Sequence, residues 1–244
     1  MILSRLIEHV KQQHWTAVFL DFLIVVAGVF VGLQAQDWNT ARTDNARANV
    51  MIARLKADFE TIEFQLHGSI GQLDTCLKAS ERVYDIVESG VAPADPDQQA
   101  AFSKALTETV QLRIPAWQSP TFVELQSSGE LNLIHDEVLK AALLEYDQRT
   151  QIALTAFKTI AERTNIFSPP IFNTMRFQPI TGASNGSKSF AVRTYDFDAM
   201  RADPKFLPAV SAFTLMLVND RVVQAQQLEK AENVLALLNK RGTK

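Results

Sequence analysis

The residue types that could do chemistry are few in this 244-residue chain, and their spacing assembles no site. The four histidines fall at His9, His14, His67 and His135. None belongs to a His-Glu-x-x-His pattern, which would bring two imidazoles and a glutamate to one helix face. His135 precedes Asp136 and Glu137, but residues one and two apart do not share a helix face. We therefore expect no metal site.

Two short stretches resemble catalytic loops but lack the residues that define them. The stretch GASNGSKS, Gly182 to Ser189, has the length of a phosphate-binding loop, but Ser187 replaces its second glycine. Pro179 lies just upstream, and the residues that follow read as extended rather than helical. The stretch LQSSG lacks the G-x-S-x-G pattern of a nucleophilic serine, so helix termination explains Ser128 and its neighbours. We expect no catalytic residue, no cofactor and no enzyme activity.

The other candidate groups have structural explanations. Asp58, Glu60 and Glu63 fall on the expected solvated face of a long helix, so they are interpreted as surface charge. Cys76 is the only cysteine, which excludes a disulfide within the chain and any thiolate metal cluster. We expect it to be a small, partly buried core residue, and a disulfide between two chains stays open.

Composition limits the class of protein. The chain is 47% hydrophobic and 21% charged, which is enough for one or two compact domains with a substantial core. Its net charge is -3, whereas a nucleic-acid-binding domain would carry a basic surface. We expect no nucleic-acid partner.

The strongest signal is an apolar stretch near the N-terminus. From Thr16 to Leu33 the only ionisable side chain is Asp21. A helix of that length extends about 27 Å, close to the thickness of a bilayer core. Trp15 and Trp38 bracket the stretch, at a spacing that suits the two membrane interfaces. We expect residues 15–38 to form a transmembrane helix in the lipid bilayer, with Trp15 and Trp38 as interfacial anchors.

A buried helix and a signal peptide are the two alternatives to this span. A buried helix of a soluble protein would not need flanking tryptophans. A cleaved signal peptide would have a shorter apolar region and a small-x-small cleavage site, whereas Leu33-Gln34-Ala35 fits that pattern poorly.

One face of the predicted span is polar and small. Asp21, Val25, Gly28, Gly32 and Ala35 are separated by four, three, four and three positions, which places them on one side of a helix. Gly28 and Gly32 form a GxxxG pair, which lets another helix approach closely. We expect this face to be a contact seam for a second copy or for another membrane protein. The alternative is that the GxxxG pair is accidental and that Asp21 reaches toward the headgroups.

The orientation is inferred from the flanks. The short N-terminal segment carries Arg5 and Lys11, and the other flank carries Arg42 and Arg47, so the positive charges do not decide it. A short basic tail held inside favours a cytoplasmic N-terminus. We expect a single-pass protein of the bacterial inner membrane with an extracytoplasmic, periplasmic C-terminal domain.

The rest of the chain predicts an all-α fold. Apolar residues recur by four and three from Leu55 to Val87, which predicts one long helix, continuous with the span or following it. Further helices are expected over 98–113, over a short segment capped by Thr121 and Glu124 and ended by Gly129, from Asp136 to about Thr164, and over 205–240. The four prolines and the glycine turn between 168 and 204 leave a long irregular stretch, in which Phe177–Thr181 and Phe190–Tyr195 could pair as a small hairpin.

The expected organisation therefore has three parts. Residues 1–14 are expected to form a short amphipathic tail, with a simple helical extension of the span as the alternative. Residues 15–38 form the transmembrane helix, and residues 39–244 a helical extramembrane domain. The domain is a helical bundle, with room for a small β-hairpin in the 170–200 loop.

Two blocks carry a resemblance to a known family. The stretch DFLIVVAGVFVGLQAQDWN and the stretch SPTFVELQSSGELNLIHDEVLKAALLEYD resemble a family of uncharacterised bacterial single-pass membrane proteins. In the first block the matching positions are Asp21, Gly28, Gln34, Trp38 and Asn39. In the second they are Leu125, Ser127, Ser128, Gly129 and Tyr146. Asp21 stands where glutamate is usual, Thr40 where an acid often follows, and Asp147 where a second tyrosine is common. The resemblance implies an anchored helical protein and supplies no activity.

Function is therefore expected from location and architecture. The first hypothesis is a membrane-anchored helical protein with a protein-interaction or complex-organising role. The alternative is a ligand-sensing extracytoplasmic module that signals through a partner, since helical bundles can hold small molecules between helices. Converging polar residues inside the bundle would favour the alternative.

Overall fold

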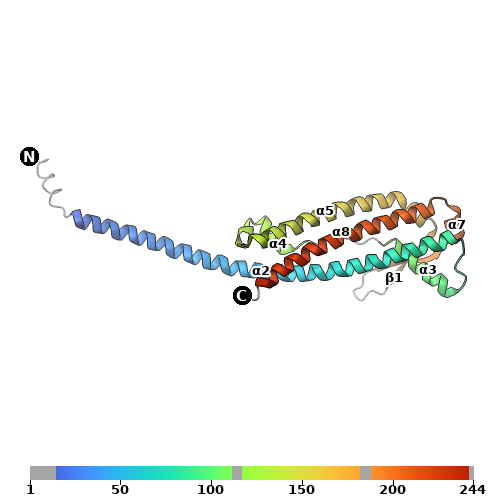
Figure 1. The fold of residues 1–244 in the computed structure, drawn as a ribbon, viewed down its shortest axis with the longest axis horizontal. Helices are drawn as coiled ribbons and strands as arrows, with labels where there is room; N and C mark the ends of the chain where they lie inside the picture. Colours follow the sequence, from blue (N-terminus) through green and yellow to red (C-terminus); the bar gives the residue numbers. More distant parts are fainter. Residues whose placement is uncertain (1–14, 112–116, 182–187, 242–244) are drawn as a thin grey trace, which may run out of the picture. The chain divides into compact units, whose positions relative to one another are not determined.

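The computed structural model describes residues 15–111, 117–181 and 188–241. The expected tail at 1–14 and the turn at 182–187 lie outside these residues. The chain divides into two compact units, Met1–Met51 and Ile52–Lys244, which are treated separately below. Within the described residues the protein is helical apart from one two-stranded hairpin (Figure 1). The predicted all-α class with a small hairpin is confirmed.

The first helix is the longest element. Helix α2 runs from Trp15 to Ser89 without interruption, so the predicted membrane segment and the predicted long helix share one secondary-structure element. Its last part buries the predicted four-three series, including Leu55, Leu66 and Val83. The helix ends where Gly90, with φ of 73°, turns the chain out of the helical path.

The Ile52–Lys244 unit is built on three long helices that lie side by side (Figure 1). These are the later part of α2, α5 (Glu137–Phe167) and α8 (Phe206–Arg241). Ser80 of α2 hydrogen-bonds Thr214 of α8, and Asp74 pairs with Arg221, so the two helices are antiparallel. Helix α5 is also antiparallel to α8, because its Glu145 pairs with Lys230 and its Thr164 contacts Met216.

Short elements close one end of the bundle. Helix α3 (Pro96–Thr109) begins at the cap Asp95, whose carboxylate accepts from the Gln98 amide. Helix α6 (Pro169–Phe172), strands β1 (Met175–Thr181) and β2 (Lys188–Tyr195), and helix α7 (Phe197–Ala202) follow α5. The strands pair antiparallel, with an irregularity in register between Arg176 and Phe177. The stretch expected to be irregular between 168 and 204 is therefore largely ordered into these elements.

Aromatic packing holds this end together. The Phe102 ring of α3 meets the Tyr195 ring edge-on at 4.9 Å and the Phe197 ring at 6.0 Å. The amide of Val192 in β2 donates to the Thr107 hydroxyl of α3. Because one strand of the hairpin is bonded to a helix as well as to its partner strand, the hairpin gains the support that an isolated pair of strands lacks.

Helix α4 (Pro120–Ser127) and the 3-10 helix η1 (Glu130–Leu133) precede α5. The predicted start of α4 is wrong: Ser119, not Thr121, is the cap, and Pro120 is the first helical residue. Proline suits that position because its missing N–H would be unpaired there anyway. The predicted end is confirmed, since Gly129 has φ of 73°. Asp136 caps α5 as predicted, through the amides of Val138 and Leu139.

Candidate functional site

The predicted membrane seam lies on the part of α2 within the Met1–Met51 unit. Val25 is 64% exposed and Ala35 is also exposed. A Cβ added at Gly28 or Gly32 would meet no atom within 4 Å. Trp38 is 70% exposed, while the side chains of Trp15 and Asp21 lie outside those the structure describes. The continuous helix gives the seam positions a common face, and their contact with a second helix stays a prediction.

Two described helices are long and apolar enough to cross a membrane, judged by length and composition. In the first, which lies in α2, none of the most apolar stretch is buried. The second is α8, where 39% of the corresponding stretch is buried. Arg221 and Lys230 of α8 form ion pairs with Asp74 and Glu145. Helix α8 is thus a core helix of the bundle, whereas the most apolar stretch of α2 is exposed throughout.

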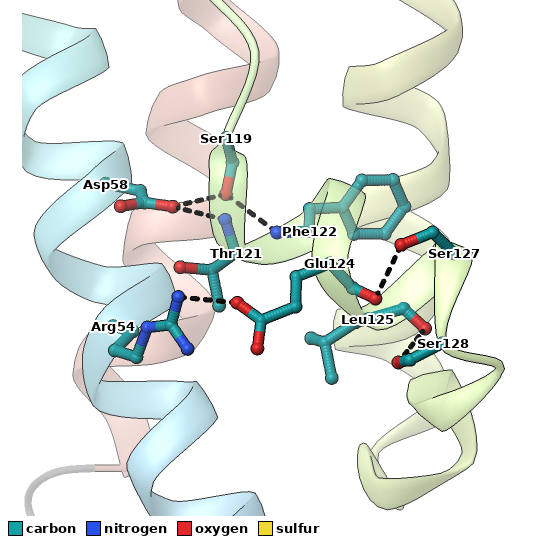
Figure 2. Close-up of polar contacts among 9 residues, drawn as sticks. All are labelled: Arg54, Asp58, Ser119, Thr121, Phe122, Glu124, Leu125, Ser127 and Ser128. Atoms are coloured by element: carbon teal, nitrogen blue, oxygen red, sulfur yellow. Dashed lines mark hydrogen bonds and ion pairs between the residues drawn. The ribbon is translucent and has the colours of Figure 1, made fainter.

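In the Ile52–Lys244 unit, the start of α4 and its Glu124 form a polar junction with α2, just before the Leu-x-Ser-Ser-Gly block at Leu125–Gly129 (Figure 2). One oxygen of the Asp58 carboxylate accepts from the Ser119 hydroxyl at 2.7 Å and from the Thr121 amide at 2.9 Å. The Ser119 oxygen accepts in turn from the Phe122 amide at 3.1 Å. A carboxylate at this position satisfies donors at the first turn of α4 and lies at the positive end of its dipole. Asp58 therefore caps a helix that is 61 residues away in the sequence.

Asp58 was expected to be surface charge, and that interpretation is wrong. The aspartate is partly buried, and its carboxylate is used by α4. Four residues earlier on α2, Arg54 pairs with Glu124 of α4 at 2.6 Å. Both of these side chains are 45% exposed, so water screens the pair and it adds orientation more than stability.

The two serines of the block end α4. The Ser127 hydroxyl donates to the Glu124 carbonyl and the Ser128 hydroxyl to the Leu125 carbonyl (Figure 2). Both bonds go to carbonyls in the last turn of their own helix, and the Glu124 carbonyl also accepts from the Ser128 amide at 2.9 Å. Leu125 is fully buried. This confirms helix termination as the role of the block, and the junction positions a helix rather than a reacting group.

Tyr146 connects the junction to the rest of the bundle. Its ring meets the Phe59 ring of α2 edge-on at 4.8 Å, one residue after Asp58. Its hydroxyl donates to the carbonyl of Trp117, just before the cap of α4. Burial raises the pKa of the Tyr146 phenol above its usual range, so the hydroxyl stays protonated and remains a donor.

A buried row of polar side chains extends from Tyr146 along the α5–α8 contact. We call it the polar ladder, and it comprises Tyr146, Thr150, Asp220, Gln224 and Gln227. All five are at most 2% exposed. The Gln227 amide donates to the Tyr146 hydroxyl at 3.2 Å and to the Thr150 hydroxyl at 2.9 Å. The Gln224 amide donates to Asp220 at 2.9 Å.

Several oxygens of the polar ladder lack a hydrogen-bond partner within the part of the chain that the structure describes. Among the described residues, Asp220 Oδ2, Gln224 Oε1 and Gln227 Oε1 have no hydrogen-bond donor. Burial raises the pKa of Asp220 from 3.8 to about 6, and the bond from Gln224 offsets part of that rise. A proton on Asp220 would supply one of the missing donors. The arrangement can therefore hold a proton inside the bundle.

Sequence reasoning missed the polar ladder. Asp220, Gln224 and Gln227 are spaced by four and three, which was a visible signal for one helix face. They interrupt an apolar helix at positions that the core pattern would assign to leucine. The partners of Gln227 on α5, Tyr146 and Thr150, were not predictable, because the pairing of the two helices was unknown.

We predict that Asp58→Ala lowers the free energy of unfolding by about 2 kcal/mol, because two donors at the start of α4 lose their acceptor. For a domain of this size the midpoint of thermal unfolding should fall by roughly 4–8 °C. Glu60→Ala, two residues along the same helix and exposed, is the matched control and should change stability little. Equal effects of the two substitutions would contradict the capping role.

We predict that Asp220 makes the stability of the bundle fall as the pH rises from about 4 to about 6. The folded pKa is raised, so the folded state keeps a proton that the unfolded state has already released in this window. A shift of about two pH units corresponds to roughly 3 kcal/mol. The loss is complete above the folded pKa.

Urea unfolding of the wild type and of Asp220→Asn at pH 4 to 8 measures this dependence. The variant should be more stable than the wild type at pH 7.5 and should lose the dependence on pH in that window. Asp85→Asn, at an exposed position of α2, is the control and should keep the wild-type profile. A wild-type profile in Asp220→Asn would refute the assignment.

Comparisons with known proteins give no match. No family model, no curated protein and no solved structure matches the chain. The resemblance of the two sequence blocks therefore stays an expectation, and function is argued from the geometry above.

Proposed function

We propose that the protein is a single-pass, membrane-anchored helical protein of the bacterial inner membrane that organises a complex through protein contacts. Residues 15–38 would lie in lipid, and the helical domain would face the periplasm. One observation carries the proposal. The apolar side chains of α2 from Phe19 to Leu33 are exposed, with none of the most apolar stretch buried.

The physical argument is the cost of that surface in water. Leucine, isoleucine, valine and phenylalanine dominate the segment, and soluble monomers rarely expose a continuous apolar surface of this size. A lipid bilayer covers such a surface on all sides of a helix, and helical backbone satisfies its own hydrogen bonds there. The helix that contains the exposed segment continues over residues 15–38, which is long enough to cross a bilayer core.

The helical domain supports an interaction role. A groove of about 500 Å³ between α5 and α8 is lined by apolar residues that include Ile160, Leu215 and Val222. Leu215 is 62% exposed. Exposed apolar side chains gathered beside a groove are typical of protein contact surfaces. At the polar junction, the side chains of Asp58 and Arg54 are bonded to α4 and its cap, so they position that helix.

The ligand-sensing alternative is the second candidate, and the polar ladder is the observation that favours it. Polar side chains do converge inside the bundle, and three acceptor oxygens there lack donors. The preferred proposal remains complex organisation, because these side chains bond mainly to one another and form a connection between α5 and α8.

We predict that the full-length chain stays in the membrane pellet after alkaline carbonate and is released by detergent. Val26→Lys combined with Val29→Lys should move part of it to the soluble fraction, because each charge near the middle of a span costs about 3 kcal/mol. Val26→Ile with Val29→Ile is the matched control and should stay in the pellet. Release of the wild-type chain by carbonate would remove the proposed anchor.

We also predict that Gly28→Leu combined with Gly32→Leu weakens self-association in a membrane two-hybrid assay by several-fold, because leucine side chains would keep a second backbone away. Val26→Leu with Phe30→Leu alters the opposite face and should leave the signal unchanged. Equal signals for both pairs would show that the seam makes no contact.

A further inference from the structure

We propose that Glu63, His67 and Glu232 form a binding site for a divalent transition metal ion, with Zn²⁺ the ion that fits best. From the sequence, Glu63 was interpreted as surface charge and no metal site was expected. The proposal concerns the Ile52–Lys244 unit and stands independently of the membrane anchor.

The geometry is that of three converging ligands. Glu63 and His67 are four residues apart on α2 and share a helix face. Glu232 comes from the antiparallel helix α8. His67 Nε2 lies 3.6 Å from a carboxylate oxygen of Glu232, and one ligand atom from each residue lies within 4.8 Å of the other two.

The backbone positions of the ligands are fixed by the core. Leu66, next to His67, and Ala231, next to Glu232, are both fully buried. The ligands therefore extend from two helix positions whose neighbours are packed in the core. The side chains of His67 and Glu232 are 60% and 49% exposed, so an ion can enter and the side chains can close on it.

The two negatively charged carboxylates at this site favour binding of a cation. Two carboxylates approach each other here, and among the described residues neither forms an ion pair with lysine or arginine. The basic side chain found here is His67, whose neutral imidazole is a common metal ligand. A dication would neutralise both acids and remove their mutual repulsion.

The donor set selects the class of metal. One imidazole nitrogen and two carboxylate oxygens suit Zn²⁺ and its neighbours, whereas Ca²⁺ and Mg²⁺ prefer six or more oxygens. Three protein ligands leave a fourth position open to solvent, where water or a group from a partner could bind. Because the ligands come from two helices, the ion would link α2 to α8.

The test is titration of ZnCl₂ into the detergent-solubilised, chelator-treated full chain by isothermal calorimetry. We expect one ion per chain at this site. His67→Ala and Glu232→Gln should each lower zinc affinity by about tenfold or more, since each removes one of three ligands. His135→Ala removes an exposed histidine elsewhere in the unit and should leave the affinity unchanged.

Thermal unfolding provides a second readout. At a zinc concentration about 100-fold above the Kd, the midpoint should rise by roughly 5–10 °C in the wild type and in His135→Ala. It should rise little in His67→Ala and Glu232→Gln. Circular dichroism checks that these exposed substitutions keep the fold. Absence of zinc binding, or unchanged affinity in either ligand variant, would overturn the site.

Discussion

The carboxylate of Asp58 joins α2 to the start of α4, 61 residues further along the chain. It accepts hydrogen bonds from the first turn of α4, while the next residue, Phe59, packs its ring on Tyr146 of α5. Tyr146 then bonds the carbonyl before α4 and the Gln227 amide of α8. One turn of α2 thus organises α4, α5 and α8, because polar groups that are buried must be bonded to one another.

A different physical demand governs the first part of α2. Its apolar side chains between Phe19 and Leu33 are exposed, so the part of the chain that the structure describes does not cover them. A bilayer would cover these apolar side chains with lipid, so no other part of the protein would need to pack around the helix. The same secondary-structure element thus combines an apolar surface that needs a nonpolar solvent with a later surface that is buried by helices of its own unit.

Local patterns predicted the elements well. The four-three series predicted the later part of α2, and the cap at Asp136, the left-handed Gly129 and the two strands followed from turn and cap residues. The polar sites were not predictable in the same way. From the sequence Asp58 was interpreted as a surface acid, because its partner α4 begins 61 residues further on. Likewise, the proposed ligand Glu232 is 165 residues from His67. Spacing in the sequence shows which residues share the face of one helix. These sites combine residues from two helices, and the sequence does not show which helices pack together.

The polar ladder also limits how α5 and α8 can fit together. Apolar helices rich in alanine, valine and leucine can slide past each other by one turn and still bury similar area. In this bundle such a slip would separate Gln227 from Tyr146 and Thr150 and leave an amide in a nonpolar interior, at the cost of an unmade buried hydrogen bond. The ladder therefore selects a single alignment among alternatives that hydrophobic burial alone would leave nearly equal in energy.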